Sequence, residues 1–208
     1  MRSDADLLVA WQGGNAAAGE QLLARYRGKL LRFFDLRVSL DAEDLTQRTL
    51  LACVEGHAGI RSLESFRSYV FGIARNILLQ HVRQQSRDAR ATDFSDVGSS
   101  DPGPSPSRVV AAHEEQRLLL RVLQELPLEA QLVLELYYWE GMPPQEIADA
   151  FGMPKSTITT RLYRARQELR EAIANVNAPV RTRESLAADV ERWTASLREL
   201  KARMPDDA

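Results

Sequence analysis

Hydroxyl, basic and aromatic side chains recur at helical spacing between residues 143 and 171 of this 208-residue sequence. The segment reads PPQEIADAFGMPKSTITTRLYRARQELRE, in which a Gly-Met-Pro turn separates two helical patterns. In such a helix–turn–helix, side chains at the start of the second helix reach base edges and phosphates in a DNA major groove. A plain packing hairpin is the alternative. We predict DNA contacts from Lys155, Ser156, Thr157, Thr159, Thr160, Tyr163, Arg164 and Arg166.

A second polar stripe lies earlier, in ESFRSYVFGIARNILLQHVRQQSR. It consists of Asn76, Gln80, Arg83 and Arg87 at four, three, four spacing, with Tyr69 and Phe71 a turn or two before them. This spacing places the polar groups on one face of a helix. Amides, guanidinium groups and aromatic rings together suit a single nucleic-acid strand, whose bases stack while its phosphates are neutralised. An ordinary solvated helix face is the alternative interpretation.

The sequence lacks the residue patterns of an enzyme or a metalloprotein. The histidines, His57, His81 and His113, are scattered, and neither a metal-ligand spacing nor a nucleophile elbow or phosphate-cradling loop occurs. The single cysteine, Cys53, cannot form an internal disulfide and lies in an apolar pattern that favours a buried residue. We therefore expect no catalytic residue, no cofactor, no metal and no small-molecule substrate.

Charge is segregated along the chain, so the net charge of -2 hides local excesses. Six arginines lie between residues 61 and 90, where the only acids are Glu64 and Asp88. The preceding stretch is acidic instead. The N-terminal residues MRSDADLLVA carry acids where a signal peptide needs basic and then apolar residues, and no run of about 18 apolar residues predicts a membrane span. We expect a cytoplasmic protein.

The elements that position these side chains are predicted to be helices throughout, because apolar residues recur at helical spacing and alternating strand patterns are few. The apolar stripes are Leu22, Tyr26, Leu30 and Phe33 in one helix, and Phe66, Val70, Ile73 and Ile77 in another. A further helix is expected to begin near Asp41, and an ordinary helix with Asp41 as its cap is the plain alternative to a binding role for this stretch. The fold class is therefore all-α.

A change in composition divides the chain into two helical domains, residues 1–90 and 108–176. Residues 91–107, ATDFSDVGSSDPGPSPS, predict a flexible linker, because they cannot bury enough apolar surface to become ordered. The second domain is expected to contain helices over 109–126 and 129–139, a helix opened by Pro144, and a longer one capped by Ser156. Residues 177–208 form a C-terminal extension with a heptad pattern over 184–204.

Three stretches together resemble the extracytoplasmic-function type of RNA polymerase sigma factor, a branch of the sigma-70 family. They are DAEDLTQRTLLAC at 41–53, SFRSYVFGIARN at 65–76 and the segment from Leu126 to Arg166. In this family a promoter-melting region two is joined by a linker to a helix–turn–helix region four. The resemblance implies an alternative sigma factor, whose partners are core RNA polymerase and promoter DNA. It leaves an anti-sigma factor open as a third partner.

The resemblance also implies roles for single residues. Those matching the helix that binds core polymerase are Asp41, Glu43, Asp44, Leu45 and Gln47. Asn76 matches the position that holds a base flipped from the minus-ten element, and Gln80 follows on the same face; Arg67, Arg75, Arg83 and Arg87 would hold the backbone nearby. Tyr69 replaces a frequent tryptophan. Thr159, Thr160, Tyr163 and Arg164 match contacts to the minus-thirty-five element, where Thr159 replaces a common arginine.

Two other classes of function fit parts of the sequence. A free-standing helix–turn–helix regulator would dimerise through the C-terminal heptad and bind paired half-sites without polymerase. An interaction scaffold would retain neither polymerase nor nucleic acid at low salt.

Overall fold

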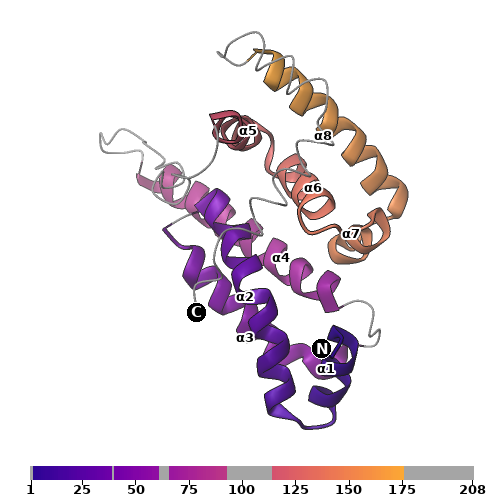
Figure 1. The fold of residues 1–208 in the computed structure, drawn as a ribbon. Helices are drawn as coiled ribbons and strands as arrows, with labels where there is room; N and C mark the ends of the chain where they lie inside the picture. Colours follow the sequence, from indigo (N-terminus) through magenta and orange to yellow (C-terminus); the bar gives the residue numbers. More distant parts are fainter. Residues whose placement is uncertain (1, 39, 61–65, 93–113, 176–208) are drawn as a thin grey trace. The chain divides into compact units, whose positions relative to one another are not determined.

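The computed structural model describes residues 2–38, 40–60, 66–92 and 114–175. It divides the chain into two compact units, Met1–Ser105 and Pro106–Ala208 (Figure 1). The described residues contain helices and short connections and no strand, which confirms the all-α prediction. The predicted C-terminal extension and nearly all of the predicted linker lie outside the described residues. None of the described helices is long and apolar enough to cross a bilayer.

The described residues of the N-terminal unit form four α-helices and one 3-10 turn. They are α1 (Asp4–Gln12), α2 (Ala16–Val38), α3 (Ala42–Gly56), η1 (His57–Gly59) and α4 (Phe66–Thr92). Helix α2 packs against α1 and α3, and α3 packs against α4. The core therefore lies between these helices and leaves the outer faces of α3 and α4 to solvent.

The predicted apolar stripe of α2 is confirmed, since its four members are at most 2% exposed. The stripe predicted for α4 is correct only in its first half. Phe66 and Val70 are buried, whereas Ile73 and Ile77 are half-buried. The buried face instead turns toward Phe71, whose ring lies 5.7 Å from that of Phe33 in α2. A large aromatic side chain buries more area than an isoleucine, and it fixes the rotation of the helix.

Between residues 114 and 175, the described part of the C-terminal unit, lie α5 (Glu114–Glu125), α6 (Leu128–Tyr138), α7 (Pro144–Phe151) and α8 (Lys155–Asn175). Pro144 occupies the first turn of α7, as predicted, because a missing N–H costs nothing there. Gly152 ends that helix with φ 61° and ψ 38°, a left-handed conformation that glycine adopts without steric cost. The turn between α7 and α8 is therefore that of a helix–turn–helix.

The prediction that Ser156 caps the last helix is wrong. Helix α8 begins one residue earlier, at Lys155, and the backbone N–H groups of Thr157 and Ile158 donate to the carbonyl of Pro154. Ser156 thus lies within the first turn and is exposed. The carbonyl of Pro154 accepts the first backbone hydrogen bonds of α8, so Ser156 lies too far into the helix to be its cap.

One side of α8 packs against the rest of its unit. Its buried residues are Ile158, Leu162, Ala165, Leu169 and Ile173. Ile147, Ala148 and Phe151 of α7 are buried on the facing side. An ion pair of 2.7 Å between Arg161 and Glu129 also joins α8 to α6. The opposite side of α8 therefore faces outward in a fixed orientation.

Candidate functional site

The outward side of α8 carries two rows of polar side chains. Its six exposed members are Lys155, Thr159 and Tyr163 in one row, and Ser156, Thr160 and Arg164 in the other. Within each row the residues are four apart, so they lie one turn above another. Tyr163 is 62% exposed, so its ring is accessible on this side of the helix. The structure therefore brings six of the eight predicted residues together on one accessible face.

Two residues predicted on this face lie elsewhere. Thr157 is half-buried. The Nε–H of Arg166 donates to the Tyr138 hydroxyl over 2.8 Å, and its guanidinium carbon lies 5.1 Å from the centre of the Tyr137 ring. These contacts combine a hydrogen bond with cation–π attraction. We therefore correct the prediction for Arg166, whose side chain fastens α8 to α6 instead of facing outward.

The polar stripe predicted on α4 is exposed along its length. Asn76, Gln80, Arg83 and Arg87 all face solvent, opposite the side of the helix that contributes to the core. Two amides at the upstream end are followed by two guanidinium groups about one and two turns further on. The face therefore offers hydrogen-bonding groups for a base beside positive charge for phosphates.

The aromatic residues predicted to accompany this stripe are not on it. Phe71 is fully buried, so its ring cannot stack on a base, and we remove it from the candidate interface. Tyr69 is half-buried, and its hydroxyl lies so close to Gly56 that a Cβ there would overlap it. Burial, with a smaller effect from the neighbouring Cys53 thiol, raises the pKa of Tyr69. Arg67 and Arg75 are half-buried beside the stripe.

Helix α3 presents acidic and amide groups outward near its start. Glu43, Asp44 and Gln47 are exposed, and the Asp44 carboxylate lies 3.6 Å from Arg48 one turn along. Leu45, by contrast, is fully buried, so the prediction that it contacts polymerase is corrected: its side chain belongs to the core.

Asp41 precedes α3 as predicted, but its side chain does not cap the helix. Its carboxylate oxygen instead lies 3.3 Å from Nε2 of His81 in α4. The expected cap is therefore replaced by a contact between α3 and α4.

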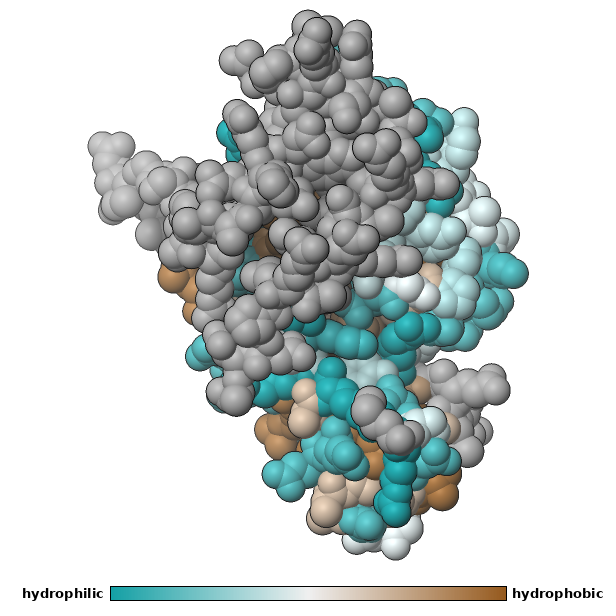
Figure 2. All heavy atoms as spheres, viewed as in Figure 1, coloured by the Kyte–Doolittle hydropathy of each residue, from teal (hydrophilic) through white to brown (hydrophobic). Residues whose placement is uncertain are grey.

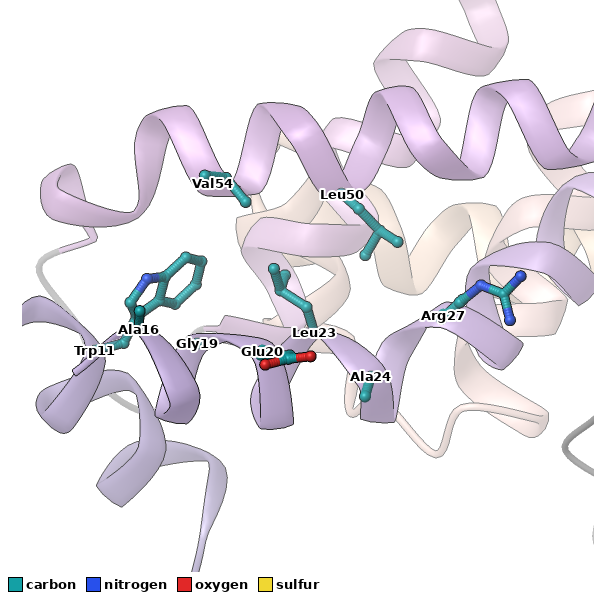
Figure 3. A pocket seen from close by; sticks show the side chains of 9 residues that line it. All are labelled: Trp11, Ala16, Gly19, Glu20, Leu23, Ala24, Arg27, Leu50 and Val54. Carbon is teal, nitrogen blue, oxygen red and sulfur yellow. The ribbon is translucent and has the colours of Figure 1, made fainter. Parts of the chain in front are cut away.

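A mostly apolar groove of about 440 Å³ lies between α2 and the second half of α3 (Figure 3). Leu23 from α2 and Leu50 and Val54 from α3 point into it, with Trp11 at one end and Arg27 at the other. Leu51 beside it is 58% exposed. Figure 2 shows hydrophobic residues reaching the surface among hydrophilic ones near the bottom of the view, in the N-terminal unit. Sequence reasoning missed this groove, although adjacent leucines at 50 and 51 place apolar groups on two sides of α3.

Trp11 joins the end of α3 to the beginning of α4. Its ring is stacked on His57 at 4.2 Å between centroids, and it meets Phe66 edge-on at 6.5 Å. Next to it, the Gln12 side-chain amide donates to the carbonyls of His57 and Ile60 over 2.9 and 3.0 Å. These contacts join residues more than forty positions apart, and no residue spacing in the sequence predicts them.

Cys53 is buried in α3, as the sequence predicts. Burial raises the pKa of its thiol to about 12. The thiol is therefore protonated at neutral pH, and a protonated thiol is a poor nucleophile. Within the four described ranges, no group of three or more histidine, cysteine or acidic side chains could hold a metal ion.

Two family models match the chain, one in each unit. Residues 20–88 match Sigma-70 region 2, and residues 116–169 match Sigma-70, region 4. The first match contains α3 and the exposed stripe of α4, and the second contains α7 and the outward face of α8.

Curated relatives agree with these matches. The chain is 30% identical over 135 residues to the probable RNA polymerase sigma factor RfaY of Xanthomonas campestris pv. campestris, covering 64% of this chain and about a third (34%) of that protein. It is 25% identical over 183 residues to the RNA polymerase sigma-H factor of Pseudomonas aeruginosa, covering 82% of this chain and 93% of that protein. Identity to the ECF RNA polymerase sigma-E factor of Escherichia coli is 24%, covering 86% and 96%.

Solved structures share the fold. The sigma factor RpoE in complex with the anti-sigma factor NepR, from Bartonella quintana, matches with a TM-score of 0.57 and 20% identity, over 74% of this chain and 94% of that one. CnrH in complex with the cytosolic domain of CnrY matches with a TM-score of 0.58 and 22% identity, over 84% and 99%. The chain belongs to the sigma-70 family, as an RNA polymerase sigma factor of the extracytoplasmic-function type.

Proposed function

We propose that the two units of this sigma factor contact a promoter at two places, while the N-terminal unit also docks on core RNA polymerase. In this proposal residues 1–90 act at the minus-ten element and residues 108–176 at the minus-thirty-five element. One observation carries it: the polar faces of α4 and α8 are both exposed, on helices whose opposite faces form the cores. Each face is therefore available to DNA without unfolding its unit.

At the minus-ten element, α4 would act on separated strands. Asn76 would hydrogen-bond a base that has left the stack, and Gln80 would extend that contact one turn further. Flipping a base costs a few kcal/mol, which binding in a polar site must offset. Arg83 and Arg87, exposed further along the same face, would neutralise the phosphates of the strand.

At the minus-thirty-five element, the outward face of α8 would enter the major groove of intact duplex. Its six exposed side chains combine hydroxyl, aromatic and basic groups, which suit base edges and phosphates together. The left-handed turn at Gly152 supports this docking, because it sets the angle between α7 and α8.

Core polymerase would bind the outer side of α2 and α3. Glu43 and Asp44 supply negative charge for a basic partner surface, and the neighbouring groove supplies apolar surface. A helix from the polymerase that combines basic and apolar side chains would satisfy both features. Leu23 and Leu50 would then contact its apolar side chains.

We place the protein in the cytoplasm, where this partner works, and assign it no active site of its own. The two solved relatives bound by CnrY and by the anti-sigma factor NepR support an anti-sigma protein as a regulator of this chain as well. Co-purification of a protein from the native host, displaced by core polymerase, would test that regulator.

The direct test of the function is to mix the purified chain with core polymerase and genomic DNA and to sequence the transcript starts. We expect starts that share two upstream elements and that vanish when the chain is left out. A free-standing regulator would instead protect paired half-sites on duplex DNA without polymerase, and would leave transcript starts unchanged. A second reaction lacking residues 178–208 would show whether the extension alters initiation.

A further inference from the structure

The threonines of α8 have limited hydrogen-bonding capacity. Thr159 and Thr160 are exposed, and each hydroxyl donates over 3.0 Å to a backbone carbonyl four residues earlier, that of Lys155 and that of Ser156. A hydroxyl has one proton to donate and two lone pairs to accept with. Because both protons are already used, each hydroxyl can only accept a bond from DNA. The remainder of each exposed side chain is its methyl group.

Base pairs differ in how they match such a surface. In the major groove an A·T pair presents the adenine amino group, which donates, the acceptors N7 and O4, and the thymine methyl group. A G·C pair presents the cytosine amino group, which also donates, but no methyl, and its guanine offers only the acceptors O6 and N7. An acceptor that loses water without gaining a donor weakens binding. The hydroxyl of a threonine that only accepts therefore fits adenine or cytosine and mismatches guanine, and the threonine methyl group then favours the thymine of an A·T pair.

The donors on this face lie one turn away from the two hydroxyls. They belong to Lys155 and Ser156 at the start of the two rows and to Tyr163 and Arg164 at their far end. The adjacent residues Thr159 and Thr160 therefore present hydrogen-bond acceptors and methyl groups, with hydrogen-bond donors one turn away in both directions along the helix.

We infer that Thr159 and Thr160 select A·T base pairs in the minus-thirty-five element. Their hydroxyl oxygens accept hydrogen bonds from the adenine amino group, and their methyl groups pack against the thymine methyl group. The inference rests on the proposed contact of α8 with that element and deepens it, because it names the base pairs. An arginine at position 159 would donate to guanine instead.

The first measurement uses the full chain with core polymerase on a promoter found by transcript sequencing. Randomising its minus-thirty-five element should return A·T at two neighbouring positions. Replacing thymine by uracil there removes only the methyl group. We expect binding to fall about fourfold per position, which corresponds to about 0.8 kcal/mol for one buried methyl. Uracil placed between the two promoter elements serves as the control and should have no effect.

Paired substitutions test each half of the side chain. Thr159→Ser and Thr160→Ser keep the hydroxyl and lose the methyl, so these variants should no longer distinguish thymine from uracil. Thr159→Val and Thr160→Val keep the methyl, so they should retain the uracil effect but discriminate less against G·C. Thermal unfolding of all four variants controls for folding.

The outcomes distinguish a failure of the threonine readout from a failure of the proposed contact between α8 and the minus-thirty-five element. If binding depends on the minus-thirty-five element but tolerates uracil, or if the serine variants keep the uracil effect, the threonine readout is overturned alone. If the unmodified chain initiates without any dependence on that element, the proposed contact of α8 is itself wrong, and the readout falls with it.

Discussion

At the scale of single residues, Asn76 is the side chain on which strand separation should depend most. Asn76→Ala removes both the donor and the acceptor that would hold a flipped base, so nothing offsets the few kcal/mol of unstacking. We expect open-complex formation to fall at least tenfold, with binding to core polymerase unchanged. Permanganate footprinting of unpaired thymines and polymerase pull-down measure the two quantities.

The matched control for that substitution lies on the same helix. Gln85→Ala changes an exposed amide of α4 that lies away from the polar stripe, so it should leave both quantities unaltered. Normal open complexes with Asn76→Ala, or an equal loss with Gln85→Ala, would contradict the assignment of Asn76.

Cys53 should be slow to react with alkylating reagents. Its pKa of about 12 means that, at pH 8, the thiolate fraction is roughly a thousandfold below that of an ordinary thiol. Labelling by iodoacetamide should therefore be slow in the native chain and fast in denaturant, as followed by mass spectrometry. Rapid native labelling would show that α3 opens or that the thiol is not buried.

The residue-scale predictions from sequence succeeded where a side chain is polar and lies opposite a clear apolar stripe. Asn76 and Thr160 are exposed for that reason. They failed at apolar residues bordering a polar pattern, as at Phe71 and Leu45, because spacing fixes the relative angles on a helix but not its absolute rotation. That rotation is set by the largest side chain that packs against the neighbouring helix.

At the scale of helices, the approach of α1 to α2 depends on Gly19. A Cβ at this position would lie 2.5 Å from the Trp11 indole, which is held by His57 and Phe66. Alanine gains about 1 kcal/mol in helix propensity, but overpacking costs about 1–3 kcal/mol. Because the indole has rings on two sides, we expect Gly19→Ala to destabilise the N-terminal unit by about 1 kcal/mol in urea unfolding.

Gly13→Ala is the control for this change. A Cβ there would meet only carbonyl oxygens at 3.4 Å, which is a far looser fit than at Gly19. Its φ of -77° also suits alanine. Unfolding free energy within about 0.5 kcal/mol of the parent chain is therefore expected. An equal loss for both variants would mean that the Trp11 contact is not the cause.

The positions of helices were predictable where proline or glycine interrupts the chain, as at Pro144 and Gly152. The residues that cap the helices were not predictable. Ser156 and Asp41 are good capping residues by type, yet Pro154 starts one helix and Asp41 turns to His81 instead. The first outcome depends on a residue two positions away in the sequence, whereas the contact of Asp41 with His81 depends on helices that folding brings close.

At the scale of the whole molecule, the functions proposed for the two units are separable, and charge reversal should show it. Asp44→Lys places a cation where a basic partner is expected, so retention on core polymerase should fall several-fold, most at low salt. The DNA preference of the C-terminal unit should remain the same. Affinity measurements on immobilised polymerase at two salt concentrations give both the size and the salt dependence.

Glu171→Lys makes the same change of charge in the other unit, at an exposed position near the end of α8. It should reduce polymerase binding much less than Asp44→Lys. Equal losses would indicate a general effect of net charge instead of a surface on α3.

Division into two units was foreseeable, because a run of serine, proline, glycine and aspartate cannot join a core. The groove between α2 and α3 was not, because it arises from side chains of two helices that meet only in the folded unit. The predicted linker and heptad extension keep their status as predictions from sequence.

The stacking of Trp11 on His57 also provides an optical probe. Contact with an imidazole ring alters indole emission, and the 4.2 Å stack lies where the N-terminal helix meets the end of α3. In a variant with Trp139→Phe and Trp193→Phe, Trp11 would be the sole tryptophan. Stopped-flow fluorescence could then time rearrangements of this corner as DNA strands separate, with no dye attached.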